Sequence, residues 1–215
     1  MDIDVIEPEP DDRGVLRRRL LGIGLGGAAV SLLPFLSGRA SASTTSTSTP
    51  ATTTTAPPKR PTDDDVALLG FAQSVEIAAR QLYDVALGTK GFDDNQRAVV
   101  ATIRESHDAY AAALSGMLGR EAPQTVNPIF DDLESSFGGD ASAVLGAAYA
   151  FESTAVATHT DILRSLQGTD GAALIASILI VEARHGTVLA HLAGDSKLDD
   201  LLVATEADAL APAKG

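Results

Sequence analysis

The chain has 215 residues, of which 45% are hydrophobic but only 4% aromatic, and it contains neither cysteine nor tryptophan. The lack of cysteine excludes disulfides, thiol catalysis and thiolate metal sites, while a formal net charge of −13 argues against nucleic acid as a partner. The many Ala and Leu residues suit close-packed helices better than sheets.

The first 42 residues have the order of features that an export signal has. Residues 17–21 read Arg-Arg-Arg-Leu-Leu, an apolar run extends to Leu36, and residues 40–42 form a small-residue cleavage site. The arginine pair resembles the twin-arginine export signal, although Leu16 replaces the usual Ser or Thr. We expect cleavage near Ala42 and export of the mature protein to the periplasm, cell envelope or extracellular space. The alternative is a signal retained as a membrane anchor.

Residues 43–62 are almost wholly Ser, Thr, Pro and Ala, which predicts a disordered linker. From residue 63 onward the apolar spacing is helical. It predicts helices at about 63–87, 95–119, 140–166 and 169–193, and a tail at 195–215 with a short helix at 198–210. A glycine follows each long helix, as a left-handed C-cap prefers; these are Gly88, Gly119, Gly168 and Gly194.

The two halves of the helical region are related by an internal repeat. Glu76 aligns with Glu152 at an offset of 76 residues, with Tyr83 on His159, and His107 aligns with Glu182 at an offset of 75. Short turns join the helices within each half, whereas a segment long enough to run the length of the bundle joins the halves. The sequence therefore predicts an all-α four-helix bundle of two antiparallel hairpins with one long crossover between the second and third helices.

Each predicted helix carries an apolar stripe with polar residues near its centre. Glu182 and His185, three residues apart, share one helix face. Several inward carboxylates repel one another unless a cation or protons intervene, and the carboxylate and imidazole groups suit a divalent or trivalent metal. The alternative is neutralisation by Arg80 and Arg184 as buried ion pairs. The candidate metal ligands are Glu76, His107, Glu152, Glu182 and His185.

Residues 63–194 resemble the ferritin-like superfamily, in particular exported bacterial ferritin-like domain proteins. That family has Glu on the first helix, Glu-x-x-His on the second, Glu on the third and Glu-x-x-His on the fourth. His107 stands where the second helix should carry its bridging Glu, and Tyr110 where it should carry its His. The resemblance therefore implies one or two iron or manganese ions at a partly degenerate di-metal site. The residues that match the pattern are Glu76, Glu152, Glu182 and His185.

Four further residues lie on the stripes or next to them in sequence. Tyr110 is a candidate phenolate ligand or redox partner, or a plain core tyrosine. Tyr83 and His159 lie ~10.5 Å along their own helices from Glu76 and Glu152, so we expect both in a second layer, too far away to ligate, or on a proton or electron path. Arg184 adjoins the stripe in sequence.

Three functions are compatible with these features. The first is an exported metal-binding protein, an iron or manganese oxidoreductase that oxidises Fe(II) or consumes peroxide or O₂. The second is a degenerate non-catalytic bundle that acts as a cell-envelope binding or structural protein. The third is a metal-storage subunit that assembles into a cage. The sequence predicts no stable membrane span in the mature form and leaves the oligomeric state open.

Overall fold

The computed structural model describes residues 56–121, 127–195, 197–202, 204 and 206–212. All of them lie within one compact unit, residues 53–215. The predicted signal peptide and the first part of the predicted linker, residues 43–55, lie outside the described residues.

The described residues form helices and no strand. Between the second and third long helices lie a short helix, α4 (Pro128–Leu133), and a 3₁₀ helix, η1 (Glu134–Phe137). A final helix, α7 (Leu198–Leu201), is much shorter than the predicted 198–210. The four long helices begin and end within one residue of their predicted bounds; they are α2 (Asp63–Leu87), α3 (Asp94–Leu118), α5 (Ala141–Ser165) and α6 (Thr169–Ala193).

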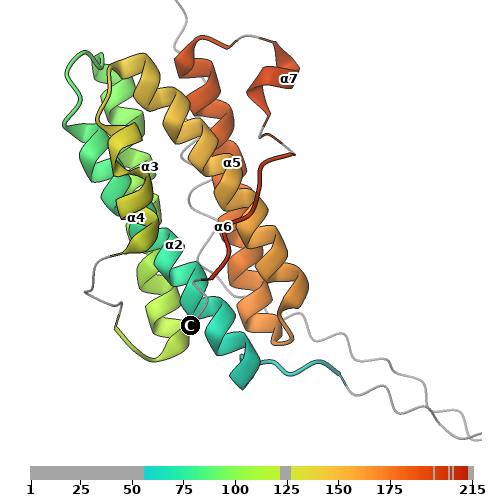
Figure 1. The fold of residues 1–215 in the computed structure, drawn as a ribbon. Coiled ribbons are helices and arrows are strands. Elements are labelled where there is room, and N and C mark those ends of the chain that lie inside the picture. The colour runs from blue at the N-terminus through green and yellow to red at the C-terminus, as the bar shows by residue number, and fades with distance from the viewer. Residues whose placement is uncertain (1–55, 122–126, 196, 203, 205, 213–215) are drawn as a thin grey trace, which may run out of the picture. The chain divides into compact units, whose positions relative to one another are not determined.

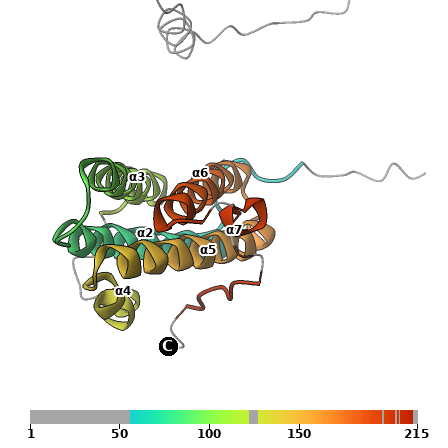
Figure 2. The ribbon, with the colours of Figure 1, turned by 90° about the horizontal axis from the view of Figure 1, so that it is seen from above.

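The long helices pack mainly in two pairs. α2 lies along α3 and α5 lies along α6, while α2 also contacts α5 and α3 contacts α6 (Figures 1 and 2). Two clusters of buried apolar side chains fill the bundle. Leu69 and Leu114 belong to one cluster, and Leu82 and Ile103 to the other. The polar stripe residues occupy the middle of each helix, between these clusters.

Two of the four glycine stops have the predicted conformation. Gly119 and Gly194 adopt the left-handed conformation, with φ of 63° and 108°. Gly88 has φ of −75°, and α5 ends at Leu166, so Gly168 is instead the N-cap of α6. The prediction of a left-handed glycine after every helix is therefore wrong for α2 and α5.

The end of the predicted linker packs against the turn between α5 and α6. The carbonyls of Pro58 and Lys59 accept hydrogen bonds of 3.0 and 2.9 Å from the N–H groups of Thr169 and Asp170. These N–H groups belong to the first turn of α6 and have no partner within the helix. The end of the linker segment therefore contributes hydrogen bonds to the first turn of α6.

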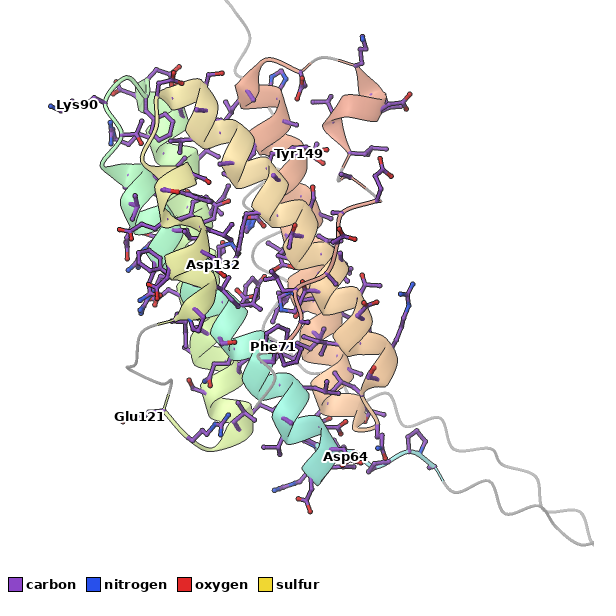
Figure 3. All side chains as sticks on the ribbon, in the orientation of Figure 1. Asp64, Phe71, Lys90, Glu121, Asp132 and Tyr149 are labelled. Atoms are coloured by element: carbon purple, nitrogen blue, oxygen red, sulfur yellow. The ribbon has the colours of Figure 1, made fainter. Side chains whose placement is uncertain are left out.

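The chain after α6 folds back along α5. The Tyr149 hydroxyl donates a 2.5 Å hydrogen bond to the Leu202 carbonyl, and Thr158 Oγ1 accepts one of 2.9 Å from the Leu210 N–H. Figure 3 shows Tyr149 on α5 facing this segment. These contacts cover part of the outer face of α5, so the C-terminal segment belongs to the folded unit.

By length and composition α6 is apolar enough to cross a membrane. The core helix of a soluble bundle passes the same test, so the composition alone does not distinguish the two. In the structure Ile175, Ile178 and Leu189 of α6 are buried in the bundle. Packing on the other helices therefore accounts for the apolar stripe of α6.

Candidate metal centre

The polar residues of the stripes gather at the centre of the bundle. The three glutamates, His107 and His159 have no exposed surface, and the His185 side chain is 12% exposed. Arg184 is exposed. The stripe residues are Glu76 and Tyr83 of α2, His107 and Tyr110 of α3, Glu152 and His159 of α5, and Glu182 and His185 of α6.

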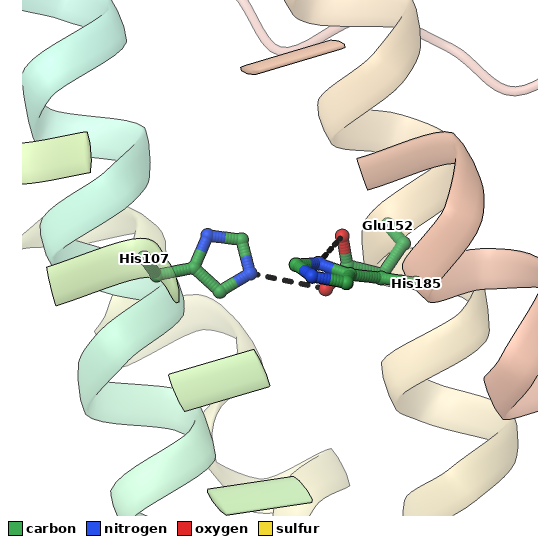
Figure 4. A group of neighbouring side chains, drawn as sticks. All are labelled: His107, Glu152 and His185. Carbon is green, nitrogen blue, oxygen red and sulfur yellow. Dashed lines mark hydrogen bonds and ion pairs between the residues drawn. The ribbon is translucent and has the colours of Figure 1, made fainter. Parts of the chain in front are cut away.

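One group combines a residue from each of three helices. Figure 4 shows His107 of α3, Glu152 of α5 and His185 of α6 pointing toward one another. His107 Nε2 lies 3.1 Å from Glu152 Oε1, and His185 Nδ1 lies 3.5 Å from Glu152 Oε2. One nitrogen or oxygen atom from each residue lies within 4.8 Å of the others, so the three side chains are close enough to share one ion.

A second group contains Glu76, His107 and Glu182, again with one ligand atom of each within 4.8 Å of the others. His107 belongs to both groups, because its Nδ1 donates a 2.8 Å hydrogen bond to Glu76 Oε2 while its Nε2 faces Glu152. A carboxylate only accepts hydrogen bonds, so both bonds require an imidazolium. Burial by itself would lower the pKa of His107, but the Glu152 and Glu76 carboxylates outweigh it and raise that pKa well above its usual value.

Tyr83 and His159 contact the glutamates of this cluster directly. The Tyr83 hydroxyl donates a 2.5 Å hydrogen bond to Glu152 Oε1, and His159 Nδ1 donates one of 2.8 Å to Glu182 Oε2. Each residue thus hydrogen-bonds to a candidate ligand, and its place in a second layer stays a prediction. The separation along its own helix does not reveal this contact, because both side chains reach a glutamate on a neighbouring helix.

The internal repeat relates these contacts to one another, because equivalent residues of the two halves make equivalent contacts. Tyr83 of α2 reaches Glu152 of α5, and its repeat equivalent His159 of α5 approaches Glu76 of α2, with His159 Nε2 3.5 Å from Glu76 Oε1. The two halves thus exchange equivalent contacts across the bundle.

Histidines, not arginines, pair with the carboxylates. In the described part of the chain, every ion pair of Glu76, Glu152 and Glu182 has a histidine as its partner. Arg80 instead pairs with Asp108 at 3.3 Å, on the outside of the α2–α3 pair. The alternative prediction of buried arginine pairs is therefore wrong.

The glutamates differ in how strongly they hold a proton. Burial would raise the pKa of Glu152, but His107 and His185 lower it to about 2, so this group is a carboxylate at neutral pH. Burial raises the pKa of Glu182 to about 7, against the opposing effect of His159. Burial also acts on His159, but in the lowering direction, and the Glu182 and Glu76 carboxylates reverse it and raise the pKa of His159. Protons held on the imidazoles thus supply part of the positive charge that the carboxylates need.

Several ligand atoms of the cluster make no hydrogen bond to a described residue. Buried polar atoms are normally hydrogen-bonded, and each exception calls for an explanation such as a bound ion. These atoms lie on α2, α5 and α6, and they are the nitrogen and oxygen types that bind iron or manganese. The residues present therefore fit a metal ion. Within the described residues, the cluster atoms that make no hydrogen bond are Glu76 Oε1, Glu152 Oε2, His159 Nε2, Glu182 Oε1 and His185 Nδ1.

Tyr110 lies at the edge of the cluster. It is partly buried and packs against the apolar cluster that contains Leu69 and Leu114. Burial, with Glu76 and Glu182, raises its pKa, which favours a protonated hydroxyl and disfavours a phenolate ligand. The structure therefore favours the interpretation of Tyr110 as a plain core tyrosine.

The fold and this cluster define a class of protein, the all-helical bundles whose core gathers carboxylate and histidine side chains in positions suited to metal ions. The chain belongs to the ferritin-like domain family, whose model matches residues 64–195. Comparisons with curated proteins and with solved structures found no match.

Proposed function

We propose that this protein binds iron or manganese at the centre of the bundle and acts as an oxidoreductase there. The observation that carries the proposal is the set of five buried ligand atoms on three helices that have no hydrogen bond among the described residues. Four of them face one another only as ion pairs of 3.5 Å, and buried polar atoms without hydrogen bonds are costly unless something binds them. A redox-active ion bound by carboxylate and imidazole groups supplies electron-transfer and Lewis-acid chemistry.

The chain's own groups have separate tasks in this proposal. Glu152 and His185 offer an oxygen and a nitrogen that lie 3.5 Å apart and make no hydrogen bond to a described residue. Tyr83 holds Glu152 Oε1 through its hydroxyl, which leaves Oε2 directed at His185. Burial keeps bulk water away from these groups and so strengthens their electrostatic interactions. Because His107 carries a proton that it must lose in order to ligate, metal binding is expected to release protons.

Metal content tests the proposal. We expect iron or manganese in the purified protein by elemental analysis, and a strong reduction in Glu182→Gln and in His185→Gln. The matched controls are Glu105→Gln on α3 and His191→Gln on α6, because both of these side chains are exposed. The wild type and both controls should then consume O₂ or peroxide with Fe(II), and the two cluster variants should not. A protein that binds no added Fe(II) or Mn(II) contradicts the proposal.

The second candidate is a non-catalytic bundle in the cell envelope, and the hydrogen bonds of His107 favour it. This imidazole spans Glu76 and Glu152 and neutralises carboxylates that an ion would otherwise hold. If the cluster is purely structural, the protein binds no metal. Glu182→Leu should then leave the melting temperature unchanged or raise it, because replacing a buried charged group by an apolar one is often neutral or stabilising.

We also infer the ferritin-like topology, with α2–α3 and α5–α6 as antiparallel hairpins joined by one long crossover. The extensive packing within these two pairs supports it, as does the short connection from Gly88 to Asp93. The connection from Gly119 to Asp140, which contains α4 and η1, is much longer. Pairwise distance measurements between spin labels at the ends of the four helices test the helix directions.

We further propose that the protein is exported by a twin-arginine signal and cleaved near Ala42. The arginine pair and the Ala-Ser-Ala of residues 40–42 support this. Mass spectrometry of the protein from an exporting host should find Ser43 as the first residue. Replacement of Arg17, Arg18 and Arg19 by Lys should retain the precursor in the cytoplasm, and unchanged export of this variant would contradict the proposal.

A further inference from the structure

We propose that two copies of this chain associate through the layer formed by α3 and α6, about a two-fold axis that runs parallel to the helices. In this dimer Arg184 of each copy faces Glu105 of the other, and Ile180 and Val188 are buried between the copies. The proposal concerns a surface of the bundle and does not depend on metal binding at its centre.

The two layers of the bundle differ in what covers them. Figure 2 shows α3 and α6 in one layer and α2 and α5 in the other. The elements of the crossover, α4 and η1, pack on α2 and α5, and the Leu210 N–H donates a hydrogen bond to Thr158 of α5. Residues 58–59 and α7 contact α6, the former at its first turn. Along the middle of α3 and α6, the outward side chains remain exposed in the described part of the chain.

The outer side of α6 is apolar although it faces solvent. The helix is apolar enough to cross a membrane, yet only 28% of its most apolar stretch is buried. Ile180 and Val188 are 58% and 42% exposed, and they share one side of the helix with Arg184, which is midway between them. A helix that is apolar on every side is normally buried all round. The outer side of α6 is therefore suited to packing against a further protein surface.

The outer side of α3 complements this surface. One exposed stripe of α3 consists of small residues and a single carboxylate; its members are Thr102, Glu105, Ala109, Ala112 and Gly116. Small side chains leave room for the branched side chains of Ile180 and Val188. The carboxylate of Glu105 has the charge opposite to that of Arg184, and neither side chain forms an ion pair in the described part of the chain.

The two charged residues lie at nearly the same level of the bundle. The rings of His107 on α3 and His185 on α6 have their centroids 5.6 Å apart. Glu105 is two residues from His107 and Arg184 adjoins His185, so their levels agree to within about one helical turn. Rotation about an axis parallel to the helices keeps each residue at its level and places α3 of one copy on α6 of the other. The dimer therefore contains the pair of Arg184 and Glu105 twice.

The face is large enough for a stable dimer. Each of the two helices has 25 residues, so each is ~37 Å long and ~10 Å wide. Together they present roughly 740 Å² per copy, which is close to the ~800 Å² per partner that stable interfaces bury. The His185 side chain, 12% exposed beside Arg184, would also be covered.

The mass of the protein in solution tests the apolar part of this interface. Sedimentation equilibrium of the protein purified from an exporting host should give two chains for the wild type and one for Ile180→Glu, because an unpaired charge buried in an interface is costly. Val66→Glu on α2 is the matched control: Val66 is 39% exposed and lies in the other layer, so this variant should remain a dimer. Circular dichroism checks that each variant is folded.

A charge exchange tests which helices meet. Arg184→Glu and Glu105→Arg should each give single chains, because each change places like charges opposite one another twice in the dimer. The double variant, which exchanges the two charges, should be a dimer again.

Each other outcome contradicts the proposal. A wild type that is not a dimer overturns it, as does a dimer that Ile180→Glu leaves intact. A dimer that Ile180→Glu dissociates, but that the charge exchange does not restore, overturns the pairing of α3 with α6. A monomeric wild type that sediments with phosphatidylcholine vesicles, when Ile180→Glu does not, assigns the face to a membrane and likewise overturns the dimer.

Discussion

Histidine and glutamate side chains alternate in the core, so the charged neighbours of each group set its protonation state. His107 lies between Glu76 and Glu152, and His159 lies between Glu76 and Glu182. Each carboxylate thus faces at least one group that can carry a positive charge. Protons and metal ions compete for these groups, so the protonation of the core and its metal content are linked.

The Tyr83 hydroxyl should stabilise the fold through its bond to Glu152. We expect Tyr83→Phe to lower the free energy of unfolding by about 1–3 kcal/mol, because it removes a buried hydrogen bond to a charged group. Urea denaturation measures this. Tyr110→Phe is the matched control and should change the stability little, because the Tyr110 hydroxyl has no hydrogen-bond partner within the described residues. Equal effects of the two substitutions would contradict the prediction.

The stability of the metal-free protein should depend on pH in a way set by the cluster. The lowered pKa of Glu152 stabilises the fold above about pH 4.5, and this contribution is lost as the pH falls toward 2. The raised pKa values of His107 and His159 stabilise it below about pH 6.5, and this contribution is lost as the pH rises through the folded-state values. The raised pKa of Glu182 acts in the same direction, with its contribution lost between about pH 4.5 and 7.

We therefore expect the metal-free protein to unfold at lower urea concentration at pH 9 than at pH 5.5. Measurements in the presence of a chelator test this. His107→Gln should flatten the dependence on the alkaline side, because it removes an imidazole that is hydrogen-bonded to two carboxylates. A stability that increases steadily from pH 5.5 to 9 would contradict the assigned protonation of the cluster.

The junction of α5 and α6 is fixed by contacts with two distant segments of the chain. The Asp65 carboxylate of α2 accepts hydrogen bonds of 2.8 and 2.9 Å from the N–H groups of Gln167 and Gly168. Residues 58–61 pass so close to the junction that a Cβ atom on Gly168 would lie 2.6 Å from the Arg60 carbonyl oxygen. Three segments that are far apart in the sequence meet here, with no room for a side chain.

Gly168→Ala should therefore destabilise the bundle by about 1–3 kcal/mol, because the backbone of residues 60–61 must move to relieve the clash. Gly146→Ala on α5 is the matched control. Gly146 is exposed, and an added Cβ meets no atom within 4 Å. That substitution should stabilise the helix by about 0.5–1 kcal/mol. Thermal unfolding of the two variants should show shifts of opposite sign, and shifts of the same sign would contradict the account of this junction.

For the whole molecule, metal binding and folding should be linked. The candidate ligands come from four different helices, so the unfolded chain has no assembled site. An ion at about 100 times its dissociation constant should stabilise the fold by about 2.7 kcal/mol, which corresponds to a rise in melting temperature of roughly 5–10 °C. Differential scanning calorimetry with and without Mn(II) measures this rise. His185→Gln should reduce it, whereas His191→Gln should not.

The four long helices could be predicted from the sequence because the determinants of a helix are local. Apolar spacing of three and four residues, acidic caps such as Asp93 and Asp140, and stops such as Gly119 and Gly194 act within one or two turns. The same spacing placed Glu76, Glu152 and Glu182 on inward faces, and all three are completely buried. Patterning alone thus determined which side chains enter the core.

Only the tertiary structure decided which of those side chains meet. Tyr83 and His159 are separated from the glutamates of their own helices by two turns, but they contact Glu152 and Glu182 on neighbouring helices. The docking of residues 58–62 on α6 is likewise a contact between distant parts of the chain. Distance along one helix follows from the rise per residue, but distance between helices depends on how their surfaces pack. The sequence by itself therefore determined the helices and their buried polar residues, and the packing of the four helices decided the partners within the cluster.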